Sequence, residues 1–424
     1  MRTVIVSDVH LGDPTCSMIN DATLAPGDKY EAFKQAAGRD NDYLILLGDV
    51  IDLSITDYET AFKVAKAFFQ LIQVDKIAKS VIYVPGNHDF DLWHTVEHQI
   101  SVIHQIAVGR PARSFRWSVP GFIDDRANSR TKGFHLPGVT TLVDPEHFDG
   151  VPMFLNSITL DTSGAGQPTY FYFAYPNLYF VTDTESILIT HGHYLEGWWT
   201  MVSEWVFKIA QEDLRIGDAL DLRELAAINS PQCQLACTGV GQAGPLTEVV
   251  RAIQYEVKRQ DFGRVKRILD RLDDEVDKLT AYGKLDPREW GTDLVSNYVK
   301  GKILEELKKV KDTRFSEEFI HKREVLDRFR TFFGASWVEI CDLNEKFQLG
   351  IPMPRKVIFG HTHQPIGWGT QQAPRVQVTG GNVVTLYNTG GWLWRDLRKR
   401  PGDFCGAAVF VYDSATGFTS RLIE

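Results

Sequence analysis

Residues 3–10 read TVIVSDVH, an apolar run rich in β-branched residues that ends in Asp8 and His10. Such a run predicts a buried β-strand. The polar residues directly after it would lie at the carboxyl end of the strand, which is where open α/β sheets hold their ligand sites. This stretch therefore predicts both a fold class and the position of a site.

Four later stretches repeat the same design, an apolar run followed at once by Asp, Asn or His. They are YLILLGD (43–49), SVIYVPGN (80–87), SILITHGHY (186–194) and KVIFG with the histidine after it (356–361). Helical patterns at 29–38 and 58–72 separate the first three runs. Strands that alternate with helices in this way predict an α/β fold with helix-covered sheets.

The middle of the chain has a different pattern. Residues 110–190 are rich in aromatic and β-branched residues broken by Pro and Gly, which predicts strands and long loops. Residues 195–350 are almost wholly helical in pattern, and apolar strands return after them. The predicted parts are a discontinuous catalytic domain, residues 1–195 and 350–424, and a helical inserted or cap domain, residues 196–349.

Within the insertion, six apolar residues repeat at spacings of three and four. They are Phe262, Val265, Leu269, Leu272, Val276 and Leu279. This seam predicts a helix that packs within a bundle. The alternative is contact with a second copy of the chain, which leaves oligomerisation through the insertion open.

The composition is globular and acidic, with a net charge of −9 and a pI of about 5.8 over 424 residues. This charge argues against binding to long nucleic acids, which relies on many Lys and Arg contacts to phosphates. The five cysteines indicate a reducing compartment, and Cys233 with Cys237 could supply only half of a zinc site. No apolar run has the length of a transmembrane helix, so we expect a cytoplasmic protein and leave peripheral membrane contact open.

The polar clusters at the strand ends contain six of the 12 histidines. Imidazole, carboxylate and amide groups without thiolates suit divalent ions such as Mn, Fe, Co or Zn. These groups outnumber the ligands of one ion, which indicates two ions that share a carboxylate. Gly360 and Pro365 flank His361 and His363, which predicts a tight turn that sends the two imidazoles to different ions.

In order along the chain, the clusters read DVH, GDVID, GNHD, HGH and GHTH. This five-part pattern resembles the signature of the calcineurin-like metallophosphoesterases. The resemblance implies a four-layer α/β/β/α sandwich that binds two divalent ions, Mn²⁺ first, with Fe, Zn or Co as alternatives. Position by position, it implies one ion on Asp8, His10 and His363, a second on Asn87, His191 and His361, and Asp49 as the bridge.

The resemblance also implies the reaction, which is hydrolysis of a phosphate ester by a hydroxide shared between the two ions. His88 matches a histidine that stabilises the transition state or protonates the leaving oxygen. Asp89 would orient His88, and Asp52 would act through hydrogen bonds to residues around the ions.

The helical insertion between HGH and GHTHQP is similar in layout to the UDP-2,3-diacylglucosamine pyrophosphatase branch, which cleaves a lipid-linked pyrophosphate. The chain differs in its far larger insertion and in His88, where that branch has arginine. Trp198 lies on an apolar helix face that would form a substrate wall or pack the insertion onto the core. Further candidates for substrate contact, with surface roles as the alternative, are His193, Arg110, Arg113 and Arg116.

We therefore expect an enzyme that hydrolyses a phosphomonoester, phosphodiester or pyrophosphate bond of a small or lipid-linked substrate. The alternative within enzymes is a nuclease or a cyclic-nucleotide phosphodiesterase. The alternative outside enzymes is a scaffold protein with structural metals, whose insertion recruits a partner.

Overall fold

The computed structural model describes residues 1–129, 132–138, 169–209, 221–242, 263, 266–267, 319–395 and 403–424. The chain divides into two compact units, one of Met1–Gln242 with Arg314–Glu424 and one of Ala243–Thr313. The first unit contains both β-sheets. All six apolar residues of the predicted seam lie outside the described residues.

The first sheet has six strands in the order β13-β12-β1-β2-β3-β6. The strands are β1 (Arg2–Val6), β2 (Asn41–Leu46), β3 (Ala78–Tyr83), β6 (Tyr170–Phe173), β12 (Ala407–Asp413) and β13 (Gly417–Ile423). β1, β2, β3 and β6 run parallel, and Val6 pairs with Leu46 in register. The chain segments that carry Asp8 and Asp49 therefore leave the sheet side by side.

The second sheet has seven strands in the order β10-β11-β9-β8-β7-β4-β5. The strands are β4 (Gly121–Asp124), β5 (Gly133–His135), β7 (Asn177–Val181), β8 (Ser186–Thr190), β9 (Lys356–Phe359), β10 (Arg375–Gln377) and β11 (Val383–Asn388). β8 and β9 are parallel neighbours, with Ile189 opposite Ile358. This register brings the segments of His191 and His361 together, although these residues are 170 positions apart in sequence.

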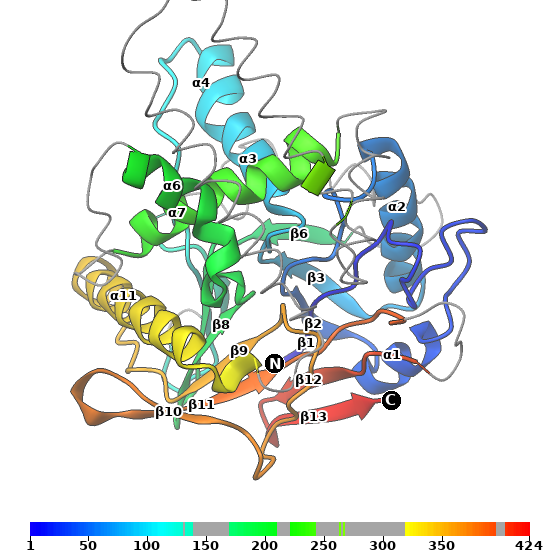
Figure 1. Cartoon of the computed structure of the whole chain (residues 1–424). Coiled ribbons are helices and arrows are strands. Elements are labelled where there is room, and N and C mark those ends of the chain that lie inside the picture. The colour runs from blue at the N-terminus through cyan, green and yellow to red at the C-terminus, as the bar shows by residue number, and fades with distance from the viewer. Residues whose placement is uncertain are drawn as a thin grey trace, which may run out of the picture. The chain divides into compact units, whose positions relative to one another are not determined.

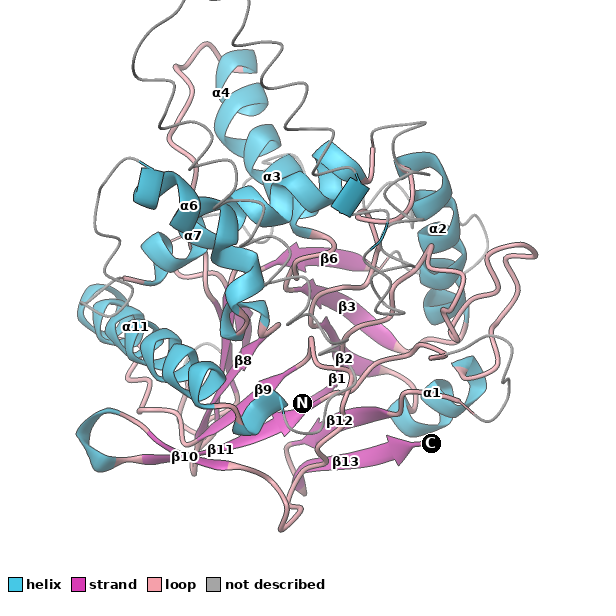
Figure 2. Cartoon of the chain, viewed as in Figure 1, coloured by secondary structure: helices cyan, strands magenta, loops and turns pink. Residues whose placement is uncertain are grey.

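The two sheets pack face to face, and helices cover their outer faces (Figures 1 and 2). Phe180 of β7 contacts Tyr412 of β12 with ring centroids 4.6 Å apart, so aromatic rings fill the interior. Phe69 of α2 contacts Phe171 of the first sheet, and Ser336 of α11 binds the second sheet. These contacts confirm the predicted α/β/β/α layers. The helices that form the two outer layers are α1 (Tyr30–Ala37), α2 (Tyr58–Val74) and α11 (Arg323–Phe347).

The remaining described helices lie between strands or in the predicted insertion. They are α3 (Phe90–His98), η1 (Gln99–Ile103), α4 (His104–Ala107), η2 (His193–Leu195), η3 (Gly197–Thr200), α6 (Met201–Ile209), α7 (Leu222–Gln234), η4 (Leu235–Val240), η7 (Phe319–His321) and η8 (Thr379–Gly381). Local sequence explains their ends: Asp221 and Glu224 form a reciprocal capping box at the start of α7. The described helices between 196 and 349 belong to the same compact unit as the sheets, so their separation as a domain stays a prediction. None of the described helices has the length and apolar character needed to cross a membrane.

Candidate metal centre

Every predicted ligand lies just beyond the carboxyl end of a strand, and most have an unusual backbone conformation. Among the described residues, nine other than glycine have a positive φ, and five of them are Asp8, His10, Asp49, His361 and His363. This left-handed conformation costs on the order of 1–3 kcal/mol per residue and persists mainly at functional sites. It shows that His361 and His363 form a tight turn, as predicted, and do not continue β9.

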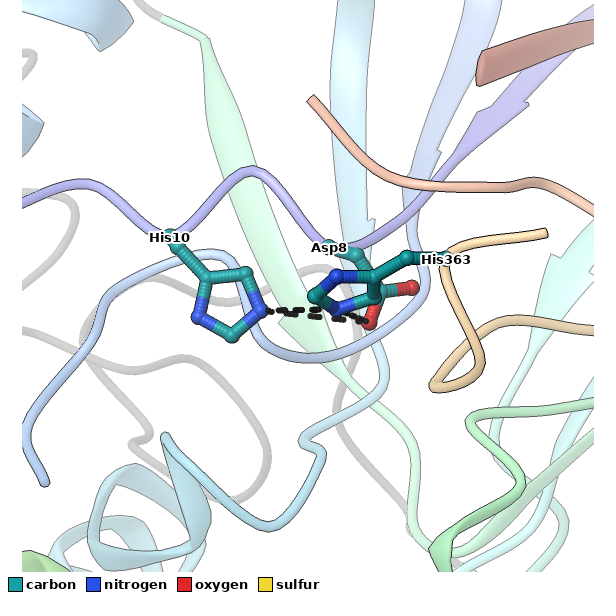
Figure 3. A group of neighbouring side chains, drawn as sticks. All are labelled: Asp8, His10 and His363. Atoms are coloured by element: carbon teal, nitrogen blue, oxygen red, sulfur yellow. Dashed lines mark hydrogen bonds and ion pairs between the residues drawn. The ribbon is translucent and has the colours of Figure 1, made fainter. Parts of the chain in front are cut away.

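The first ligand group consists of Asp8, His10 and His363, all fully buried. Nε2 of His363 lies 3.1 Å from Oδ1 of Asp8 and 3.2 Å from Nε2 of His10 (Figure 3). Nδ1 of His10 contacts Asp52 at 2.7 Å, which directs Nε2 toward the group. Two imidazole nitrogens and a carboxylate oxygen thus converge, as ligands of a divalent cation do.

The second ligand group consists of Asp49, His191 and His361, all buried, with Asn87 beside it. Nε2 of His191 lies 3.2 Å from Oδ2 of Asp49 and 3.1 Å from Oδ1 of Asn87. Nδ1 of His191 lies 2.9 Å from the carbonyl oxygen of Leu47, so Nδ1 donates and Nε2 is the nitrogen that can bind a cation.

Asp49 lies between the two ligand groups. Its Oδ2 is 3.2 Å from Nε2 of His191 and 3.9 Å from Nε2 of His10. The backbone amide of His361 also donates to Oδ2 of Asp8 at 2.9 Å, which joins the groups on their other side. The two groups are therefore contiguous, and one carboxylate contacts histidines of both.

The electrostatics of the cluster favour positive charge. Burial raises the pKa of Asp49, but the charges of His191, His88 and His10 outweigh burial and hold this pKa well below its ordinary range. Burial lowers the pKa of His191, yet the negative charge of Asp49 raises it to about 9. Buried carboxylates that hold protons on adjacent imidazoles provide a field and a donor set that fit divalent cations.

His88 lies beside the first ligand group and has 14% of its side chain exposed. Its Nδ1 lies 2.6 Å from Oγ of Ser54 and 3.2 Å from Oδ1 of Asp52, and its ring centroid is 4.9 Å from that of His10. Asp52 thus contacts Nδ1 of both rings, which explains why His10, Asp52 and His88 form a third close group. This partly exposed imidazole is oriented at the rim of the ligand cluster.

The orienting role predicted for Asp89 falls to Asp52 in the structure. Asp89 accepts hydrogen bonds from the backbone amides of Gly86 and Val50 at 2.6 and 2.8 Å, and from the Tyr83 hydroxyl at 2.5 Å. Burial raises the pKa of Asp89. Asp89 therefore holds the loop that carries His88, while Asp52 holds the ring.

Two glycines before ligands are required for different reasons. Gly48, directly before Asp49, has a φ of 77°, a left-handed conformation that glycine adopts readily. A Cβ atom at Gly86 would lie 2.3 Å from Oδ1 of Asp49. Gly86 is therefore required because Asp49 occupies the space beside it, and not because the chain turns sharply there.

The segment after β8 contributes two residues that the sequence did not single out. Oε2 of Glu196 lies 2.9 Å from Nε2 of His361. The buried ring of Trp199 lies 6.0 Å from that of His88 and 6.5 Å from that of His361. α-Helical spacing selected Trp198, which is partly buried against the core, but residues 197–200 form a 3₁₀ turn to which this spacing does not apply. A role of Trp198 in substrate binding stays a prediction.

His193 is fully buried, which excludes the alternative of a surface role. Its ring centroid lies 5.6 Å from that of His191, and its two nitrogens have no hydrogen-bond partner among the described residues. Burial and the neighbouring His191 and His361 hold its pKa well below the ordinary range. A contact of this neutral imidazole with substrate stays a prediction.

The three predicted arginines differ in their surroundings. Arg116 binds Glu97 with two guanidinium nitrogens at 2.6 and 2.9 Å, so a buried carboxylate already occupies its bidentate face. Arg110 and Arg113 are exposed. Recognition of a substrate phosphate by these residues stays a prediction.

Cys233 and Cys237 are buried free thiols. Sγ of Cys237 lies 3.3 Å from the carbonyl oxygens of Asn87 and His88, so this thiol supports the loop of the site. No metal-compatible group found in the described part of the chain contains a cysteine, which argues against the zinc alternative.

Comparison with known proteins adds one match. The family model described as calcineurin-like phosphoesterase matches residues 1–215, about half of the 424 residues. This match begins before Asp8 and extends beyond Trp199. No curated protein matches the chain significantly.

Proposed function

The chain belongs to the calcineurin-like phosphoesterase family, a family of metal-dependent hydrolases, and from this premise we propose that it hydrolyses its substrate with two divalent cations, Mn²⁺ first. The observation that carries the proposal is the position of Asp49, whose Oδ2 contacts histidines of both ligand groups. Cations bound to these groups would lower the pKa of a water molecule and neutralise charge on the phosphate.

His88 has the position of a residue that acts on the substrate directly. Ser54 and Asp52 hold Nδ1, so Nε2 is the nitrogen that can reach a non-bridging or leaving oxygen. Asp52 fixes the rings of His10 and His88 together. The protein then needs no nucleophile of its own. Its residues would bind the cations, orient the histidine rings and protonate the leaving oxygen.

We propose a small or lipid-linked phosphate ester or pyrophosphate as the substrate. The net charge of −9 disfavours a long nucleic acid, and Trp199 supplies an aromatic surface beside His88 and His361. The layout shared with the UDP-2,3-diacylglucosamine pyrophosphatase branch supports a pyrophosphate. The same indole can stack on a base, which makes a cyclic-nucleotide phosphodiesterase the second candidate.

The test is reconstitution of metal-free protein with Mn²⁺, Fe²⁺, Zn²⁺ or Mg²⁺, followed by assays on four substrates. These are p-nitrophenyl phosphate, bis-p-nitrophenyl phosphate, a nucleoside diphosphate sugar and single-stranded DNA. We expect the reconstituted protein to hydrolyse one of the small substrates and to bind two ions per chain. Mn²⁺ should restore this activity more effectively than Mg²⁺. Cleavage of DNA alone would contradict the substrate class, and an inactive protein with two bound ions would favour the scaffold alternative.

A further inference from the structure

The carboxylate of Glu196 contacts the second ligand group through His361. Oε2 of Glu196 lies 2.9 Å from Nε2 of His361, and the two side chains are 17% and 6% exposed. The other ring nitrogen, Nδ1 of His361, is buried and has no hydrogen-bond partner among the described residues. One nitrogen of this ring is therefore held by a carboxylate, and the other has no partner in the described part of the chain.

A buried polar atom without a partner is unfavourable, so it usually binds a water molecule or an ion. In metal sites, a histidine that binds the cation through one nitrogen commonly donates the N–H of the other to a carboxylate. We propose that Glu196 is a positioning residue, which keeps Nε2 of His361 protonated and directs Nδ1 to the second cation. This inference rests on the proposed function.

The position of Glu196 makes it a link between the insertion and the cation. Its amide donates to the His193 carbonyl at 3.1 Å, and its carbonyl accepts from Trp199 at 3.3 Å. These bonds place Glu196 between η2 and η3, on the segment that also carries the Trp199 ring to His88 and His361. The segment that places Trp199 near His88 thereby also orients a ligand.

The experiment compares Mn²⁺ binding by the whole protein and its variants, measured by calorimetric titration and by metal content. Glu196→Ala should lower the affinity for one of the two bound Mn²⁺ ions by about 10–100-fold, the effect typical of residues that orient a ligand. Glu196→Gln should weaken it less, because the amide oxygen still accepts from Nε2. The matched control is Glu204→Ala. It removes the carboxylate of a residue on the adjoining helix α6, which binds Arg328 of α11, and should leave Mn²⁺ binding unchanged.

A double variant separates positioning from direct ligation. In a His361→Ala background, titrated to Mn²⁺ concentrations that fill the weakened second site, Glu196→Ala should cause no further loss of affinity, because its effect passes through His361. Additional loss would show that Glu196 binds the cation itself and would overturn the inference, as would wild-type binding by Glu196→Ala. A wild-type protein that binds no Mn²⁺ would instead contradict the proposed function.

A second inference comes from a surface independent of the site. α3, η1 and α4 form one continuous helix that runs away from both sheets (Figure 1). Ile103, Ile106 and Val108 near its end are 58%, 63% and 49% exposed, and Arg110 and Arg113 follow them on the surface. We call these five residues the basic apolar tip.

The segment that carries the tip has a charge opposite to that of the whole chain. Residues 98–123 contain no Asp or Glu, although the whole chain has a net charge of −9. Exposed apolar side chains next to arginines are complementary to an anionic lipid surface. Burial of the apolar side chains and electrostatic attraction of the arginines to the lipid head groups both favour binding there. We infer that the basic apolar tip docks on an anionic membrane.

The test is co-sedimentation of the protein with vesicles of phosphatidylcholine alone or mixed equally with phosphatidylserine. We expect binding to the mixed vesicles only, weakened by salt and lost in Ile106→Asp and in the pair Arg110→Glu with Arg113→Glu. Val206→Asp, which changes an exposed valine of α6, is the matched control and should still bind. Binding to neither vesicle, or equal binding to both, would overturn the inference, as would a dimer in solution that Ile106→Asp dissociates.

Discussion

The two ligand groups are built alike but supported differently. The first is held by the sheet core: Asp52 fixes His10, and the hydroxyl of Ser7 contacts Asp8. In the second, Glu196 and Trp199 from the segment after β8 contact His361. The first group is thus supported within the sheet core, whereas the second also depends on the segment after β8. This difference offers a route by which an insertion can adjust one cation and leave the other unchanged.

The largest effect is expected for Asp49→Asn, because the carboxylate of Asp49 contacts histidines of both ligand groups. The substitution removes the negative charge between His10 and His191, so both cations should bind weakly. Because bound cations contribute several kcal/mol to transition-state stabilisation, we expect phosphoesterase activity to fall by about 10³-fold or more. Metal content and circular dichroism distinguish loss of cations from loss of fold. Retention of two tightly bound Mn²⁺ would show that Asp49 is not shared.

The next effect should separate the groups. His363→Ala should abolish high-affinity binding of the cation of the first group and His361→Ala that of the second, since their rings point into different groups. Each loss of a ligand should exceed the about 10–100-fold effect of a residue that only orients one. Mn²⁺ titration should then show one remaining site in each variant. Loss of both ions in both variants would contradict the division into two groups.

A smaller effect is expected for Asp52→Asn, the counterpart of Glu196 in the first group. Asp52 contacts His10 at 2.7 Å and His88 at 3.2 Å, so its loss should lower both affinity for one cation and kcat. We expect about 10–100-fold for the affinity. The second cation, measured in the same titration, is the internal control. A change confined to the second cation would contradict the assignment.

Much of this arrangement could be predicted from sequence because it depends on short-range patterns. An apolar run followed by Asp or His identified Asp8 and His361 as strand-end residues, and the strands lie where those runs were. The role of Asp52 could not be separated from that of Asp89, because it depends on which side chain a folded loop turns toward His88. Glu196 lies 165 positions before His361, and nothing local indicates their contact. The sequence predicted only strands and long loops over residues 110–190. It did not indicate that residues 170–183 contain two strands, β6 and β7, which enter different sheets.

The smallest effect concerns how α11, an outer-layer helix, is held against the second sheet. Glu339 of α11 accepts a hydrogen bond from Tyr179 of β7 at 2.7 Å and another from Ser118. Burial raises the pKa of Glu339 from its ordinary 4.5 to about 7, although both hydrogen bonds oppose the shift. Between these two pH values the folded protein holds a proton that the unfolded chain has released. Stability should therefore fall as the pH rises from about 4.5 to 7 and stay level above that range.

Glu339→Gln removes this titration and keeps a group that can hydrogen-bond to Tyr179 and Ser118. Relative to the variant, the wild-type protein should lose about 1–3 kcal/mol of stability between pH 5 and pH 8, as seen by thermal unfolding. α11 also carries Phe332, whose ring stacks on that of Tyr194, two residues before Glu196, with centroids 4.9 Å apart. If the second group depends on α11, the ratio of its Mn²⁺ affinity in Glu339→Gln to that in the wild type should rise between pH 5 and pH 8, while the same ratio for the first group stays constant. Equal pH profiles for both cations in both proteins would mean that α11 does not control the Mn²⁺ affinity of the second group.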